Sequence, residues 1–525
     1  MNGRRLAAAG SRYAVATPHI EATRAAADAF EAGGNAIDAA LAAATTLAVA
    51  YPQMCGVGGD VFALVRTPDE RVVSVNSTGA APLALDPAVV RSRNDAMPER
   101  GPLTITAPGA VAGWAAVHRL GGRRAWRDAF RHAATLATEG VSVARGLAES
   151  YHDHAELLLA DAGARQVHAP DGAPLREGER LINAGLGGTL EAIADDGPEA
   201  LYGGDVGRAY VEGLGEAGSP MTLDDLRNHE AETLAPIVGR FDDLEVSTSP
   251  PTSQGFVMLQ ALAVIERLGL DPDPLGPDAD AIALAFAAAA RDRDSHLADP
   301  RFMAVPVERL LSDAHIGEMT SAVRDRRHTR TARTPPLGGT AGLVTADADG
   351  FAVSLIQSLS WGFGSGILEP RTGIIAQNRG TGFVLDERDP DALAPGKRPR
   401  HTLMPVLAHR DARLAAVSGT MGGPAHPQIN AASLIRSMRL GMPAGDAVAA
   451  PRWIVGGIDA IEGTATAEAD VPEETVALLA SAGLDVTRLP RHDSSTGHAH
   501  LIAVRGDGSF DVGTDPRADG EAAAS

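Results

Sequence analysis

The chain has 525 residues and a formal net charge of −21, which argues against a nucleic-acid partner and against binding to anionic membranes. Hydrophobic residues make up 44% and charged residues 22%, as in soluble globular proteins, and the length allows several domains or one large layered unit. The start of the chain lacks the long apolar segment of a secretion signal, and the apolar run over residues 39–50 is too short and rich in Ala and Thr for a membrane span. We therefore expect a cytoplasmic protein with no membrane partner.

The first part of the chain favours two helices followed by strands. Residues 21–32 form a helical pattern that ends at a Gly pair, and Asn35 is placed to cap a second helix over residues 36–49. A glycine-rich loop over residues 56–60 precedes a strand at 61–65, with another strand at 72–75. Because this loop follows a helix and precedes a strand, the order is wrong for a phosphate-binding loop.

The rest of the chain alternates helical patterns with breaks. Helical patterns cover residues 126–201, 256–267 and 281–298, and Thr222 caps a further helix with Asp225 three residues later. Residues 299–336 are charged and interrupted by Pro and Gly, so we expect an exposed, mobile segment there. Beyond residue 340 the sequence favours strands with two helices, near 428–438 and 472–482, and residues 514–525 are predicted to be disordered.

One stretch in the second half of the chain has the features of a reactive site. Asp349-Gly350 is typical of a hairpin turn, and residues 343–345 and 351–356 on either side favour strands. Thr340 therefore lies at the open end of a β-hairpin. We hypothesise that the chain cleaves itself between Gly339 and Thr340, which makes Thr340 a new N-terminus with a nucleophilic hydroxyl. The alternative is an ordinary Gly-Thr step that opens a hairpin.

The chemistry of an N-terminal threonine suits this hypothesis. A threonine hydroxyl is a weak nucleophile that needs a base, and the α-amine of an N-terminal Thr340 would lie within reach. Such an amine titrates at about 7.7–8.0 when unperturbed, close to the pH at which a general base is useful. Gly339 has no Cβ, so the bond before Thr340 can adopt conformations that most residues resist.

Two other groups of residues with reactive side chains have simpler alternatives. Cys55, the single cysteine, is either a thiol nucleophile or a small buried side chain, and no histidine lies in its local motif. His498 and His500 would share one face of a strand, with His492 near them, which could make a metal site. No further ligand clusters with them, so ordinary histidines are the alternative. The chemistry proposed for Thr340 needs no metal and no cofactor.

Six short motifs in a fixed order carry a resemblance that spans nearly the whole chain. They are residues 33–40 (GGNAIDAA), 56–59 (GVGG), 107–113 (APGAVAG), 250–255 (PPTSQG), 364–367 (GSGI) and 419–423 (GTMGG). Together they resemble the γ-glutamyltranspeptidase family of N-terminal-nucleophile hydrolases. The resemblance implies an α+β fold, a four-layer αββα sandwich. It also implies self-cleavage into a large piece (residues 1–339) and a small piece (340–525) that stay together as one folded unit, with Thr340 as nucleophile.

The resemblance also implies roles for three residues around the nucleophile. Gly422 and Gly423 match the family's glycine pair, whose backbone N–H groups form the oxyanion hole, and two amides without side chains can approach an oxyanion closely. The alternative is a glycine turn between a strand and a helix. Ser358 falls where the family has a hydroxyl residue that orients the nucleophile, and a polar strand residue without that role is the alternative.

The residues that grip a γ-glutamyl group in the family are replaced here. The family's arginine aligns with Thr78, its Asp-Asp pair with Thr381-Gly382, its Ser-Ser pair with His401-Thr402 and its Asn with Ser360. The resemblance implies that these are the substrate-binding positions of this chain. A neutral threonine cannot replace the bidentate fork of an arginine toward a carboxylate. Arg379, Arg400 and His401 could hold a differently placed anion, or they could be structural residues.

These observations predict a self-cleaving amidohydrolase that acts through an acyl-enzyme on Thr340. The substrate would be a small amide or a γ-glutamyl compound, and the acyl group would pass to water or to an amine. The alternatives are a true glutathione hydrolase or γ-glutamyltransferase, and an inactive family member that no longer cleaves and acts as a binding protein. The expected partners are the two cleaved pieces for each other, and assembly into a homo-oligomer is left open.

Overall fold

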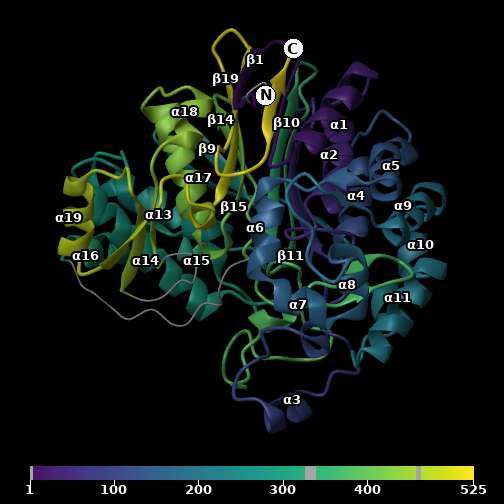
Figure 1. Ribbon diagram of the computed structural model, residues 1–525. Coiled ribbons are helices and arrows are strands. Elements are labelled where there is room, and N and C mark those ends of the chain that lie inside the picture. The colour runs from purple at the N-terminus through teal and green to yellow at the C-terminus, as the bar shows by residue number, and fades with distance from the viewer. Residues whose placement is uncertain (1–3, 326–338, 457–462) are drawn as a thin grey trace.

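The computed structural model describes residues 4–325, 339–456 and 463–525. Two antiparallel sheets, each of seven strands, pack face to face, and helices cover both outer faces (Figure 1). The first sheet has the order β21-β2-β10-β11-β3-β4-β7. Its strands are β21 (Glu521–Ala524), β2 (Tyr13–Thr17), β10 (Gly339–Asp347), β11 (Ala352–Ser360), β3 (Asp60–Arg66), β4 (Val72–Ser77) and β7 (Glu232–Leu234).

The second sheet lies against the inner face of the first and has the order β1-β20-β19-β15-β14-β9-β8. Its strands are β1 (Ala7–Gly10), β20 (Phe510–Thr514), β19 (His498–Val504), β15 (Arg413–Met421), β14 (Val406–Arg410), β9 (Leu244–Thr248) and β8 (Ile237–Phe241). Between the sheets lies an apolar layer of small and branched side chains, including Val344, Ala346, Leu64, Val417 and Ile502. Alternating strand residues supply this layer, because successive side chains point to opposite faces.

Helices complete the outer layers on each side. The first sheet is covered by helices that include α1 (Ile20–Glu31), α2 (Ala36–Ala50), α4 (Ala110–Arg119), α5 (Arg131–Glu139) and α9 (Ala184–Asp196) (Figure 1). The second is covered by α13 (Gly255–Leu268), α14 (Ala279–His296), α16 (Asp313–Arg324), α17 (His426–Leu434) and α18 (Ala444–Ala449). Other labelled helices are α3 (Pro87–Arg93), α6 (Arg145–Asp153), α7 (Ala155–Ala160), α8 (Ala162–His168), α10 (Glu199–Tyr202), α11 (Asp205–Glu216), α15 (Val307–Leu310) and α19 (Glu473–Ser481). The predicted four-layer αββα sandwich is confirmed.

Helix α2 is the element that supports the central strands from outside. Asn35 and Asp38 form a capping box at its start, and every one of its 15 residues is buried. Its small side chains let it pack closely on β10 and β11. The helix is joined to the hairpin turn because the Asp347 carboxylate accepts a hydrogen bond from Ala36 N at 2.7 Å. The predicted helix and hairpin are both confirmed.

Two predictions about disorder are wrong. The end of the chain forms β21, which pairs with β2, and Arg517 just before it is fully buried between Glu468 and Asp515. The charged segment from residue 299 contains α15 and α16, and Asp299 is buried in an ion pair with Arg398 at 3.0 Å. Composition does not reveal this order, because Asp299 and Arg517 are paired with opposite charges inside the protein. The rest of that segment, residues 326–336, lies outside the described residues.

No helix in the described part of the chain is long and apolar enough to cross a membrane.

Candidate active site

The open end of the β10–β11 hairpin contains an interruption in strand register. Gly339 pairs with Ser360, but Thr340 pairs with Ser358, so the register shifts between the first two residues of β10. Such a bulge bends the strand and redirects side chains, and bulges are frequent beside active sites. Thr340 is fully buried at this point. The bond expected to be cleaved therefore lies at an irregular position inside the sandwich.

The peptide group before Thr340 is tightly enclosed. A Cβ atom added to Gly339 would lie 2.7 Å from the Trp361 carbonyl oxygen and 2.8 Å from that of Gln53. Backbone atoms cannot move aside as a flexible side chain can. Only glycine fits here without a shift of the chain.

Ser358 brings together the hydroxyl and carbonyl groups around this bond. Its Oγ accepts a hydrogen bond from Thr340 Oγ1 at 3.1 Å and donates to the Gly339 carbonyl oxygen at 2.5 Å. It also receives hydrogen bonds from Ser360 N at 2.9 Å and from Arg379 Nη2 at 2.8 Å. A hydroxyl has one proton and two lone pairs. Because the two N–H groups and the Thr340 hydroxyl all donate to Ser358, its own proton is left for the carbonyl of Gly339.

A buried carboxylate lies behind this hydroxyl. Asp60 opens β3 directly opposite Ser358 and is fully buried. Its Oδ1 accepts from Gly79 N and from Gln377 Nε2, both at 2.9 Å, and its Oδ2 lies 4.0 Å from Arg379 Nε. Burial raises the pKa of Asp60 to about 6, while Arg379 and the hydrogen bonds act in the opposite direction. Asp60 is therefore ionised at neutral pH.

His401 completes the group around Asp60. Its Nε2 lies 3.1 Å from Asp60 Oδ2, and its Nδ1 accepts a hydrogen bond from Leu403 N at 3.2 Å. Since Nδ1 is an acceptor, the proton of the neutral ring lies on Nε2 and is donated to Asp60. Burial, helped by the charge of Arg379, holds the pKa of His401 well below its usual value. His401 is thus a neutral donor.

The two sheets meet closely beside this site. A Cβ atom on Gly342 would lie 2.8 Å from Thr420 N, and one on Gly419 would lie 3.4 Å from the Leu343 carbonyl oxygen. The contacts therefore run in opposite order along β10 and β15. The end of β15 therefore packs against β10 two residues after Thr340.

Those residues are the predicted oxyanion pair. Gly422 follows β15 with a φ of 155°, and Gly423 has a φ of 53°, a conformation that favours glycine. A side chain on Gly422 would also collide with Ile429, whose Cδ1 lies 2.4 Å from the Cβ position. This turn follows the end of β15, which packs against β10. The oxyanion role itself stays a prediction.

Comparison with known proteins identifies the family. The family model described as gamma-glutamyltranspeptidase matches residues 22–525. The chain belongs to this family.

The relatives match along nearly their whole length. The glutathione hydrolase-like YwrD proenzyme of Bacillus subtilis (strain 168) is 34% identical over 520 residues, which cover 98% of each chain. The oxamate amidohydrolase proenzyme of Klebsiella pneumoniae is 33% identical over 522 residues, or 96% of this chain and 97% of the relative. The crystal structure of cephalosporin acylase from Bacillus halodurans superposes with a TM-score of 0.90 at 30% identity, covering 100% of this chain and 98% of the other.

The predicted substrate positions of this family member fall into two groups. Ser360 pairs with Gly339, next to Thr340, and has a φ of 81°, and Thr381 is half-buried in the short turn η3 (Arg379–Gly382). Thr402 is linked to the Gly422-Gly423 turn, because Gln254 Nε2 donates both to the Thr402 carbonyl at 2.9 Å and to the Gly423 carbonyl at 3.1 Å. Arg400, half-buried, has Asp391 as its nearest acidic partner, 3.8 Å away. Their roles toward a substrate stay predictions.

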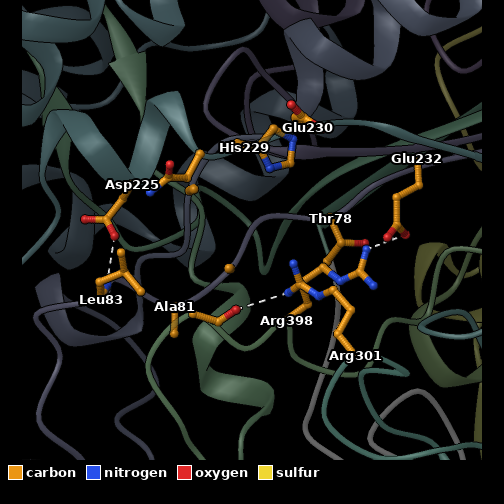
Figure 2. Close-up of a pocket in the computed structure, with 13 residues that line it drawn as sticks. Thr78, Ala81, Leu83, Asp225, His229, Glu230, Glu232, Arg301 and Arg398 are labelled. Carbon is orange, nitrogen blue, oxygen red and sulfur yellow. Dashed lines mark hydrogen bonds and ion pairs between the residues drawn. The ribbon is translucent and has the colours of Figure 1, made fainter.

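Thr78 lies instead on a cavity behind the Asp60 group. The cavity has a volume of about 280 Å³, and the Thr78, His229 and Arg398 side chains line it (Figure 2). Arg398 is already paired there with Glu232 at 2.6 Å. Thr78 Oγ1 donates to Asn76 at 2.6 Å, so this hydroxyl is held by its own strand.

Cys55 and the C-terminal histidines His498 and His500 all lie in buried surroundings. Cys55 is buried, accepts from Gln357 Nε2 at 3.2 Å, and has its pKa raised to about 12 by burial, so it is a poor nucleophile. His498 and His500 are buried and bonded to Tyr51 and Thr514. Within the described ranges, no group of three His, Cys, Asp or Glu side chains could hold a metal ion.

Sequence reasoning missed Asp60, the carboxylate at the centre of the site. It had assigned this residue to a glycine-rich loop. The available signal was a single acidic residue directly before the apolar strand 61–65, which is an unusual place for a charge unless it is paired. Its partners come from distant segments, so spacing could not identify them.

Proposed function

We propose that this chain is a proenzyme that cleaves itself before Thr340 and then hydrolyses small amides with the Thr340 hydroxyl. The observation that supports this most is the placement of Thr340 Oγ1 and the Gly339 carbonyl oxygen around one hydroxyl, Ser358 Oγ, at 3.1 and 2.5 Å. Two relatives that match along nearly the whole chain are named proenzymes.

Self-cleavage would proceed through an ester. The Thr340 hydroxyl attacks the carbonyl carbon of Gly339, and Ser358 donates its proton toward the developing oxyanion. The C–N bond then breaks, and the nitrogen of Thr340 takes up the proton that the hydroxyl lost and becomes a free amine. Water hydrolyses the remaining ester, which yields a carboxylate on Gly339 and restores the hydroxyl of Thr340.

Turnover would use the same hydroxyl with its new base. The α-amine of Thr340 takes the hydroxyl proton while Oγ1 attacks the substrate amide, and it then passes the proton to the leaving amine. The N–H groups of Gly422 and Gly423 would stabilise the oxyanion, and Ser358 would orient the nucleophile. Water releases the acyl group from the enzyme.

The substrate class follows from what the site lacks. Thr78 cannot bind a carboxylate as an arginine does, and Thr381-Gly382 offers no carboxylate for an α-amine. Arg379 and His401 both face Asp60, so the charge of Arg379 is compensated within the protein. We therefore favour small acyl amides over γ-glutamyl compounds, in line with relatives named oxamate amidohydrolase and cephalosporin acylase. A glutathione hydrolase is the second candidate, because one relative is named glutathione hydrolase-like.

The test is to purify the full chain and determine the N-termini of its fragments. We expect a fragment that begins Thr-Ala-Gly-Leu-Val, whereas the Thr340→Ala chain stays whole. The cleaved protein is then assayed on oxamate, on other small acyl amides and on γ-glutamyl-p-nitroanilide. Efficient turnover of the last compound would favour the second candidate. A wild-type chain that stays whole after prolonged incubation would overturn the proposal and indicate a binding protein.

A further inference from the structure

Asp60 is held as an ionised group by donors whose orientations are fixed. Gln377 Nε2, one of its donors, also donates to the Ala107 carbonyl at 3.0 Å, so the amide cannot be turned to offer its oxygen. His401 offers a proton because its other nitrogen accepts from Leu403 N. The third donor, Gly79 N, is a backbone amide. All three groups donate, and hydrogen bonds of this kind favour the carboxylate over the acid.

Arg379 depends on this carboxylate. Arg379 is 6% exposed, and its nearest acidic group is Asp60, 4.0 Å from Nε. Among the described residues Nε has no hydrogen-bond partner, while Nη2 donates to Ser358 at 2.8 Å. A buried cation without its counter-charge is strongly unfavourable. Loss of the charge on Asp60 would therefore release Arg379 from Ser358.

We infer that Asp60 is a positioning residue for self-cleavage: its carboxylate holds Arg379 so that the Ser358 hydroxyl proton is directed at the carbonyl of Gly339. Arg379, Ser360 N and Thr340 Oγ1 all donate to the oxygen of Ser358, so the proton of Ser358 is left for the scissile carbonyl. This inference rests on the proposed self-cleavage before Thr340.

The inference predicts a simple pH dependence before cleavage. The uncleaved chain has no α-amine on Thr340, so that group cannot contribute. Burial raises the pKa of Asp60 to about 6. The titratable and charged groups that face it are Arg379, His401, His229 and Tyr202. Burial lowers the pKa of His229 to about 4 and the pKa of His401 well below its usual value. Burial also lowers the pKa of Arg379 to about 10 and raises the pKa of Tyr202.

Among these groups, Asp60 alone changes charge between pH 5 and 8. A carboxyl with a raised pKa is ionised above that pKa and neutral below it. The rate of self-cleavage should therefore be constant above about pH 7 and fall about tenfold for each pH unit below about 6.

The experiment follows self-cleavage of the full chain after a short pulse of cell-free synthesis, at pH values from 5 to 8, by gel electrophoresis. Asp60→Asn should cleave roughly 10- to 100-fold more slowly at pH 7.5 and lose the decline at acid pH. The matched control is Asp347→Asn, which changes a buried carboxylate at the turn end of the β10–β11 hairpin and should cleave as the wild type does. Gel filtration of each uncleaved chain checks folding.

The outcomes separate the inference from the proposed function. Asp60→Asn with the rate and pH profile of the wild type would overturn the inference and leave self-cleavage intact. Should the variant fail to fold, the wild-type profile still decides, because a flat rate from pH 5 to 8 contradicts a required carboxylate. A wild-type chain that never cleaves would overturn the proposed function instead.

Discussion

The two ends of the β10–β11 hairpin differ although the same two strands form both. At the turn, Asp347 accepts from Ala36 N at 2.7 Å and Phe351 N at 3.1 Å, and the strand register is regular. At the open end the register shifts between Gly339 and Thr340, and a hydroxyl, a guanidinium and a carboxylate are buried together. Each end has one buried carboxylate with several N–H donors.

The carboxylates of Asp347 and Asp60 differ in the groups that they bind. Asp347 ties neutral backbone amides of a helix and a turn to the strand, which only stabilises the fold. Asp60 faces a buried cation that in turn holds the hydroxyl next to Thr340. Buried polar groups with a charge among them are costly and sensitive to change. The comparison suggests that the hairpin is stabilised at its turn and made reactive at its opening.

The largest effect is expected from Ser358→Ala, which removes the hydroxyl at the reactive end. Loss of one oxyanion donor should slow self-cleavage roughly 10²–10³-fold. The rate of appearance of the two fragments on a gel measures this. The control is Ser354→Ala on the same strand, where the hydroxyl donates to the Ser418 carbonyl at 2.7 Å and takes no part in the site. Equal rates for the two variants would contradict the role of Ser358.

A smaller effect, on stability and not on cleavage, is expected from Asp347→Ala at the turn. Two buried N–H groups lose their acceptor, which should lower the free energy of unfolding by about 1–3 kcal/mol. Urea denaturation of the uncleaved Thr340→Ala chain, with and without this change, measures the difference. Folded molecules of the single variant should still cleave at the wild-type rate. A loss of cleavage without loss of stability would show that the two ends are coupled.

The smallest effect is expected from Gly350→Ala in the turn itself. Gly350 has a φ of 97°, where a side chain is strained, so the substitution should lower stability by about 1 kcal/mol without changing cleavage. Gly506→Ala is the control, since a Cβ there meets nothing within 4 Å. The thermal midpoints of the two variants give the comparison. A Gly350→Ala chain as stable as the control would remove strain as the reason for glycine in the turn.

Local patterns in the sequence were sufficient to predict the parts of the site that lie close together in the chain. The hairpin, the position of Thr340 and the helix capped by Asn35 follow from turn residues, strand patterns and capping. The centre of the site could not be found in this way. Asp60 meets Gln377 and His401 only after the chain has folded, and these residues are more than 300 positions away.

The errors at the charged segments have a related cause. The charged residues, with Pro and Gly among them, predict disorder in residues 299–336 and 514–525. In α16, Ile316, Met319, Thr320 and Val323 are buried at helical spacing, a signal that was present in the sequence but outweighed by the charges around it. For Arg517, no local pattern could reveal that Glu468 and Asp515 neutralise it inside the protein.

The strand order has a consequence for a chain that is cut before Thr340. In the first sheet β2, from the part before the cut, lies between β21 and β10, which come after it, and in the second sheet β14 pairs with β9 across the same division. Each sheet would thus contain hydrogen-bonded strands from both polypeptides. Neither could leave without unravelling both sheets, and a nicked molecule should keep the hydrodynamic size of the intact one until it is denatured.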